Sequence, residues 1–215
     1  MSSPKLVVPA LVTTLLVGFA PPLFAADLAD VQMPDRIEVA GKPLLLNGMG
    51  IRKVTMLEVE VYVAGLYLEQ RSRDALEIIG SAQTKRIALR FKRRVGRREL
   101  VQIWEEGFKK NAGRELAALR NRIYMLSSWM PDLHAGDTLT FTYIAGRGVE
   151  VGINGNAKGT IVGASFARTL WSIWLGAEPL NEELKRGLLG LRTPHRRNDH
   201  LRLGPPPGPE VARGE

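Results

Sequence analysis

Hydrophobic and polar residues alternate along several segments of the chain, and the longest such segment lies within residues 48–68. In it, Leu57, Val59, Val61 and Val63 alternate with Glu58, Glu60, Tyr62 and Ala64. A period of two predicts a strand with two distinct faces. The alternation changes phase at Ala64-Gly65, where a glycine predicts a β-bulge or a close backbone approach. The Gly-Met-Gly sequence at residues 48–50 is predicted to form a flexible loop before the strand.

Similar patterns predict the other elements. Two strand-like pieces flank Gly41-Lys42-Pro43 within residues 37–46 and predict a hairpin, and alternation predicts strands at residues 86–91, 138–145, 148–153 and 158–161. Apolar residues that recur every three or four positions predict helices at residues 70–80, 97–111, 115–130, 162–175 and 179–186. Asn154-Gly155 is a two-residue hairpin signal. Because strands and helices are segregated and hairpins join the strands, the chain is predicted to have an α+β fold, an antiparallel sheet covered by helices.

The helix predicted at residues 97–111 has the clearest apolar face. That face contains Leu100, Ile103, Trp104, Gly107 and Phe108. Gly107 lowers the helix propensity. Its missing side chain would let another backbone or a ligand come close.

The composition is that of a globular protein and excludes several chemistries. The chain has 215 residues, enough for one domain with tails, and no cysteine, which excludes disulfides, thiolate metal sites and a cysteine nucleophile. The three histidines, His134, His195 and His200, lack metal-ligand spacing, so neither a metal nor a cofactor is expected. A Ser-His-Asp set would depend on His134 in a loop and is disfavoured.

Both ends of the chain differ in composition from its middle. Lys5 precedes the apolar residues 6–24, and Ala25-Ala26 follows them, which is typical of a secretory signal at residues 1–26. An uncleaved membrane anchor remains the alternative. Residues 192–215 are basic and proline-rich and are predicted to be disordered. The predicted domain is therefore 27–191, exported and periplasmic.

A run of basic residues lies at residues 85–98, where no acidic residue occurs. Its members are Lys85, Arg86, Arg90, Lys92, Arg93, Arg94, Arg97 and Arg98. The net charge of +8 also favours acidic partners. The run is interpreted either as a solvated strand face and loop or as a contact with an anionic membrane surface or another partner. Nucleic acid is not expected, because aromatic residues do not interleave with these charges.

Arg52 and Tyr62 are the candidate ligand-binding residues. An arginine offers a rigid fork of donors that fits a carboxylate, and a phenol beside it in an apolar setting would complete an anion clamp. The spacing alone leaves an alternative open, in which Arg52 is a surface loop arginine and Tyr62 is an ordinary aromatic residue of a strand.

Several segments, in matching order, resemble the chalcone isomerase-like superfamily, and specifically its exported bacterial branch. These segments are residues 48–52, 61–68, 104–108, 136–137, 172–176 and 188–190, with the sequences GMGIR, VYVAGLYL, WEEGF, GD, SIWLG and LLG. The resemblance covers most of residues 31–190. It implies an open-faced β-sandwich, a large antiparallel sheet with helices laid over it.

The resemblance also implies a function. Arg52 matches the arginine that binds substrate oxygens in the isomerases, and Arg52 with Tyr62 matches the pair that holds the carboxylate in fatty-acid-binding relatives. The tyrosine and asparagine donors of the isomerases fall near Leu100 and Gly107, neither of which can donate from a side chain. Losing such donors costs ~10²–10³ in rate each.

The sequence therefore predicts an exported, non-catalytic protein that binds a small amphipathic ligand, most simply a fatty acid. Apolar residues of the sheet and of the helices at 97–111 and 162–175 are expected to enclose the tail. Two alternatives stay open: an isomerase or lyase of the chalcone isomerase type acting in the same cleft, and a module that binds a membrane surface or partner.

Overall fold

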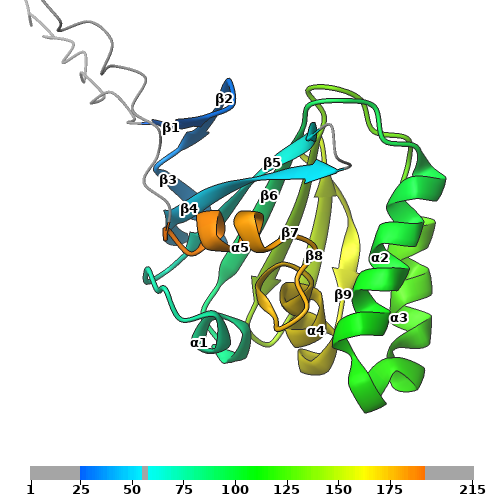
Figure 1. The fold of residues 1–215 in the computed structure, drawn as a ribbon. Helices are drawn as coiled ribbons and strands as arrows, with labels where there is room; N and C mark the ends of the chain where they lie inside the picture. Colours follow the sequence, from blue (N-terminus) through cyan, green and yellow to red (C-terminus); the bar gives the residue numbers. More distant parts are fainter. Residues whose placement is uncertain (1–24, 55–57, 192–215) are drawn as a thin grey trace, which may run out of the picture.

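A seven-stranded antiparallel sheet forms the centre of the computed structural model, which describes residues 25–54 and 58–191 (Figure 1). The strands lie in chain order across the sheet, each hydrogen-bonded to the next. They are β3 (Arg36–Val39), β4 (Lys42–Val54), β5 (Val59–Leu68), β6 (Lys85–Phe91), β7 (Thr138–Ile144), β8 (Gly148–Ile153) and β9 (Asn156–Ile161). The predicted secretory signal and the predicted disordered tail lie almost wholly outside the described residues.

The helices cover one face of this sheet (Figure 1). They are α1 (Ala75–Gly80), α2 (Arg97–Asn111), α3 (Leu116–Ser128), α4 (Ala164–Leu175) and α5 (Glu182–Leu188), with a 3-10 turn, η1 (Gly113–Glu115), before α3. One hydrophobic cluster joins the inward side chains of all five helices to those of β5–β9. The predicted α+β architecture, an antiparallel sheet covered by helices, is confirmed.

The change of phase in the long strand comes from a β-bulge near its start. The pairing of β4 with β5 shifts between Arg52↔Tyr62 and Lys53↔Glu60, so Val61 is an extra residue on β5. The predicted bulge exists, but not at Gly65. The close approach at Gly65 is made by a side chain and not by another backbone, because a Cβ on Gly65 would overlap the Met33 sulfur.

The Gly-Met-Gly sequence at residues 48–50 does not form the predicted loop, since all three residues belong to β4. These glycines let α5 approach the strand at backbone distance. A Cβ on Gly48 would lie 2.7 Å from the carbonyl oxygen of Leu188, and one on Gly50 would lie 2.5 Å from that of Leu184. The pattern therefore reflects helix–strand packing rather than flexibility.

A short hairpin covers part of the opposite face of the sheet. It consists of β1 (Ala25–Leu28) and β2 (Val31–Pro34), which pair with each other and lie beside the β3–β5 end of the sheet (Figure 1). Met33 packs in a second hydrophobic cluster with residues of β3, β4 and β5. The Lys92 ammonium donates to the Ala29 carbonyl at 2.6 Å and so connects the hairpin turn to the end of β6.

Lys85, at the start of β6, is buried beneath the C-terminal end of α1. Its ammonium donates to the carbonyl oxygens of Ile78, Ile79 and Ser81 and lies 5.2 Å from the Tyr143 ring centroid. Burial lowers the pKa of Lys85 to about 8, so the ammonium is the main form at pH 7. Because α1 leaves its last carbonyls without partners inside the helix, Lys85 acts as their hydrogen-bond donor.

Tyr67 makes the stability of the fold sensitive to alkaline pH. Burial, together with the negative charge of Asp35, raises the pKa of Tyr67 to about 12 from the ordinary value of 10. Below pH 10 the phenol is neutral in both folded and unfolded chains, and its contribution to stability is fully present. Between pH 10 and 12 only the unfolded chain ionises, so stability falls as the pH rises.

We therefore expect the wild type to lose about 2 kcal/mol of unfolding free energy relative to Tyr67→Phe between pH 9 and pH 12. Urea unfolding at both pH values measures this difference. Tyr124→Phe is the control, because Tyr124 is 76% exposed and should leave the pH dependence unchanged. Parallel pH curves for the wild type and Tyr67→Phe would contradict the expectation.

Candidate functional site

Arg52 lies on β4, directly opposite Tyr62 on β5. In an antiparallel pair, residues directly opposite each other project from the same face of the sheet, with Cβ atoms about 5 Å apart. For these two residues it is the face covered by the helices, where Tyr62 belongs to the main hydrophobic cluster. The strand pairing therefore brings the two predicted site residues together.

The Arg52 guanidinium is partly used by the protein itself. Nη1 donates to the Leu180 carbonyl at 3.0 Å, in the segment that joins α4 to α5. Nε is buried and has no partner among the described residues. A buried donor without an acceptor costs about 1–3 kcal/mol, so Arg52 holds unused capacity for an anionic oxygen.

The Tyr62 hydroxyl is buried at the same place. It accepts a hydrogen bond of 3.2 Å from the Trp174 indole Nε1 on α4. Burial raises the pKa of the Tyr62 phenol, while the positive charge of Arg52 and the bond from Trp174 oppose that rise. The hydroxyl therefore stays protonated at neutral pH, and its own hydrogen is free to be donated.

Aromatic side chains fill the space on the helix side of this pair. Trp104 of α2 lies 5.7 Å from Trp174 and 5.4 Å from Phe141, measured between ring centroids. Phe91 lies 5.6 Å from Tyr62. The expected apolar lining from the two helices is present, but its side chains pack against one another. Two cavities at the surface of the described residues border neither Arg52 nor Tyr62.

The positions that would carry ketone chemistry are occupied by packing residues. Leu100 is buried in the main hydrophobic cluster. Gly107 is buried where α2 meets α4, and a Cβ on it would lie 3.0 Å from two side-chain carbons of Ile173. The close approach at Gly107 is therefore made by the Ile173 side chain, and not by the predicted backbone or ligand. Neither position offers a donor beside Arg52.

The basic residues of the run at 85–98 differ in their burial and in their contacts. Lys85 is only 2% exposed, so it is wrong to include it in a surface contact. Arg86 donates to the Thr142 hydroxyl, and Lys92 and Arg93 form ion pairs with Glu60 and Glu99. The side chains of Arg90 and Arg98 are exposed and form no hydrogen bond or ion pair within the described residues. Membrane binding by the remaining members stays a prediction.

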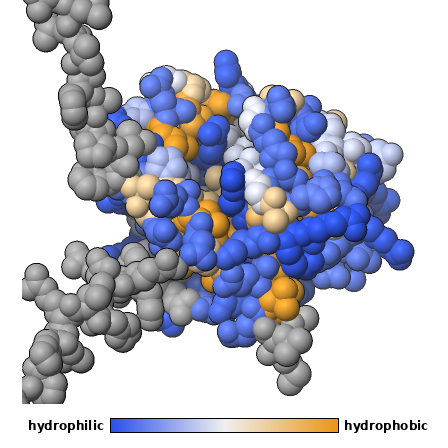
Figure 2. Space-filling model, turned by 90° about the horizontal axis from the view of Figure 1, so that it is seen from above, coloured by the Kyte–Doolittle hydropathy of each residue, from blue (hydrophilic) through white to orange (hydrophobic). Residues whose placement is uncertain are grey.

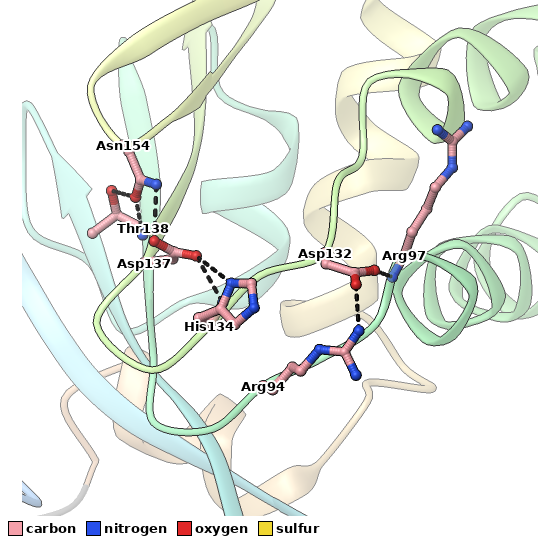
Figure 3. A network of polar contacts seen from close by, with 7 residues as sticks. All are labelled: Arg94, Arg97, Asp132, His134, Asp137, Thr138 and Asn154. Atoms are coloured by element: carbon pink, nitrogen blue, oxygen red, sulfur yellow. Dashed lines mark hydrogen bonds and ion pairs between the residues drawn. The ribbon is translucent and has the colours of Figure 1, made fainter.

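The arginines of this run also hold two loops together (Figure 3). Asp132 accepts from the Arg94 side chain and, at 2.8 Å, from the backbone N–H of Arg97 at the start of α2. Both bonds lower the pKa of Asp132, and the bond from the Arg97 backbone has the larger effect. Val95 and Leu133 exchange backbone hydrogen bonds of 2.8 and 2.9 Å between the same loops. The network is therefore structural.

His134 belongs to a neighbouring turn in the same view (Figure 3). Its backbone N–H donates to the Asp137 carboxylate at 2.7 Å, and Asn154 donates to the other oxygen at 2.9 Å. Among the described residues, no serine contacts His134 through a hydrogen bond, and the imidazole is 64% exposed. Within residues 25–54 and 58–191, no cluster of ligand side chains could hold a metal ion.

The surface at this end of the molecule is mainly hydrophilic. Figure 2, which looks down on Figure 1 from above, shows small hydrophobic patches separated by hydrophilic residues. In the described part of the chain, no helix has both the length and the apolar character needed to cross a bilayer.

Two members of the site did not emerge from the sequence. Trp174 was predicted only as part of an apolar helix face, although a buried indole needs an acceptor for its N–H. That need is a signal that could have pointed to Tyr62. Leu180 contributes a backbone carbonyl from an irregular segment, and no side-chain pattern predicts that position.

Comparisons with known proteins agree with this architecture. A family model described as chalcone isomerase-like matches residues 25–190. Among solved structures, the crystal structure of a fatty-acid binding protein from Arabidopsis thaliana is similar, with a TM-score of 0.60 at 16% sequence identity. The alignment covers 77% of this chain and 96% of that chain, and at this identity it shows the shared fold. No curated protein matches the sequence.

Proposed function

Because the chain belongs to the chalcone isomerase-like family, we propose that it is a non-catalytic protein that binds a fatty acid or a similar amphipathic carboxylate. Arg52 pairs with the carboxylate and Tyr62 donates a hydrogen bond to it. The similar plant structure is that of a fatty-acid binding protein, which agrees with this choice of ligand.

The observation that carries the proposal is the buried Arg52 Nε, which has no partner among residues 25–54 and 58–191 and lies opposite a buried phenol. A carboxylate has lone pairs for both donors, and charge-assisted bonds of this kind are about twice as strong as neutral ones. Binding would therefore use donors that are costly to leave unpaired. A ketone substrate would also need donors at Leu100 and Gly107, which these residues lack, so the geometry favours binding over isomerisation.

The tail of the ligand needs room that the aromatic side chains now fill. Trp104 and Trp174 touch through their rings, and the Trp104 Nε1 has no hydrogen-bond partner among the described residues. Rotation of Trp104 would therefore break no hydrogen bond of its own side chain. We expect ligand entry to separate these two rings and to change the tryptophan fluorescence.

The proposed place of action is outside the cytoplasm, in the periplasm, after removal of residues 1–26. The apolar residues 6–24 and the following Ala25-Ala26 support this proposal. The N-terminal residue of protein recovered from an expressing bacterium tests it. An N-terminus near Asp27 is expected, and an uncleaved Met1 in the membrane fraction would contradict it.

The binding proposal predicts that Arg52→Ala weakens oleate binding at this site at least tenfold, because the carboxylate loses its cationic partner. Tyr62→Phe should weaken it by a smaller factor, because a single neutral donor is lost. Binding is followed by tryptophan fluorescence and by native mass spectrometry.

Two variants make the result specific. Arg52→Lys keeps the charge but loses the fork of donors, so it should bind more weakly than the wild type. Arg98→Ala removes an exposed arginine of α2 and should bind as the wild type does. Equal fluorescence titrations for the wild type, Arg52→Ala and Arg98→Ala would end the proposal.

A further inference from the structure

A second place in the molecule has the features of a ligand site, and it lies on the opposite face of the sheet. A cavity of about 510 Å³ is bordered by the β1–β2 hairpin and by strands β3, β5, β6 and β7. Arg86, Ala88 and Arg90 of β6 line it. They alternate along the strand with Ile87 and Leu89, whose side chains belong to the cluster beneath the helices.

One part of this cleft is cationic. Arg90 is exposed and makes no hydrogen bond or ion pair with the described residues. Arg86 is half-buried, and its Nε donates to the Thr142 hydroxyl at 2.7 Å, whereas its terminal nitrogens donate to no acceptor among the described residues. Thr138 and Thr140 add hydroxyl groups. One carboxylate, Asp30, also lines the cleft and partly offsets the two positive charges.

The remainder of the cleft is apolar. Its lining there comes from the hairpin and neighbouring strands and includes Val31, Met33, Pro34, Ile37 and Ala88. Met33 is fixed against Gly65, and Lys92 bonds to the hairpin turn, so the hairpin is positioned as one wall of the cleft. A cavity with apolar walls and few polar anchors, in the range of about 300–1,000 Å³, is the usual form of a small-molecule site.

We propose that this cleft is a binding site for a single-chain amphipathic anion. The anionic head group contacts Arg90 and Arg86, and the hydrocarbon chain lies along the β1–β2 hairpin and Ile37. The site is independent of Arg52, because the body of the sheet separates the two. A carboxylate and a phosphate head group would use the same chemistry, since arginine forms charge-assisted bonds with both.

The test uses oleate and 1-oleoyl lysophosphatidate as probes, below their micelle concentrations, with isothermal titration calorimetry. The Arg52→Ala variant weakens the other site at least tenfold, so that binding at the cleft dominates the titration. We expect this variant to retain one site for at least one of the two probes, and the tighter probe identifies the head group. Oleyl alcohol, which lacks the charge, should bind at least tenfold more weakly.

Two further substitutions are made in the Arg52→Ala background. Arg90→Gln removes an exposed charge, so it should leave the fold intact and weaken binding about tenfold. Ala88→Phe fills the cleft and should abolish binding. Arg120→Gln, on the exposed face of α3, is the matched control and should have no effect.

Three outcomes would overturn the proposal. The first is that Arg52→Ala binds neither probe, and the second is that Arg90→Gln binds as tightly as Arg120→Gln. The third is that oleyl alcohol binds as tightly as the anions. The two proposals can fail separately. If Arg52→Ala and the wild type give equal fluorescence titrations, the proposal for Arg52 fails, but the effect of Arg90→Gln on binding at the cleft still tests the second site.

Discussion

Gly48→Ala should lower the free energy of unfolding by about 3 kcal/mol, near the upper end of the range for overpacking a closed interior. A Cβ at this position would lie 2.7 Å from the Leu188 carbonyl oxygen and 2.8 Å from the Gly190 nitrogen. Both are backbone atoms, which cannot rotate away as a flexible side chain would. The added methyl group must therefore push the end of α5 away from β4.

Urea unfolding of Gly48→Ala measures this loss. The matched control is Gly80→Ala at the end of α1, where a Cβ would meet nothing within 4 Å. That substitution should be neutral or slightly stabilising, because alanine restricts the unfolded chain. A Gly48→Ala protein as stable as Gly80→Ala would show that α5 does not pack on β4 at backbone distance.

Lys85→Met should cost about 3 kcal/mol of unfolding free energy. Methionine keeps the apolar stem but leaves the carbonyls of Ile78, Ile79 and Ser81 without the donor they now share. The Ile78 carbonyl keeps its bond of 3.2 Å from the Ser81 hydroxyl, so the cost falls mainly on the part-buried Ile79 and Ser81 carbonyls, at about 1–3 kcal/mol for each acceptor left without a partner. The attraction of the ammonium to the Tyr143 and Trp171 rings, at 5.2 and 5.7 Å, is lost as well.

Thermal and urea unfolding measure this effect, with Lys158→Met on β9 as the control. Lys158 is exposed, so its substitution should change stability by less than about 0.5 kcal/mol. In Lys85→Met, amide hydrogen exchange should accelerate more in α1 than in the other helices and strands. Equal stabilities for the two variants would contradict the role assigned to Lys85.

The arrangement of the sheet and helices could be predicted because alternation and helical periodicity are local properties of the sequence. The alternation in β5 also predicts a bulge in this strand. The pattern puts the bulge at Gly65, whereas the strand pairing has it at Val61. The glycines at 48 and 50 were misinterpreted as a loop. Only the distant α5, which packs on them, explains their lack of side chains.

The surroundings of the candidate site depended on contacts between distant residues. Arg52 and Tyr62 were predicted together, and the strand register supports their proximity. The hydrogen-bond partners of these two side chains, Leu180 and Trp174, lie more than 100 residues away along the chain. Lys85 was placed in a surface run because its neighbours are basic. The pattern gives no sign that α1 would turn its last carbonyls toward this one lysine.

The most direct test of the binding account is a crystal structure of the protein with oleate. The account predicts density for a carboxylate within hydrogen-bond distance of the Arg52 Nε and the Tyr62 hydroxyl, with Trp104 and Trp174 moved apart along the tail. An Arg52–Tyr62 pair that stays empty under a closed Trp104–Trp174 contact, at saturating oleate, would contradict it.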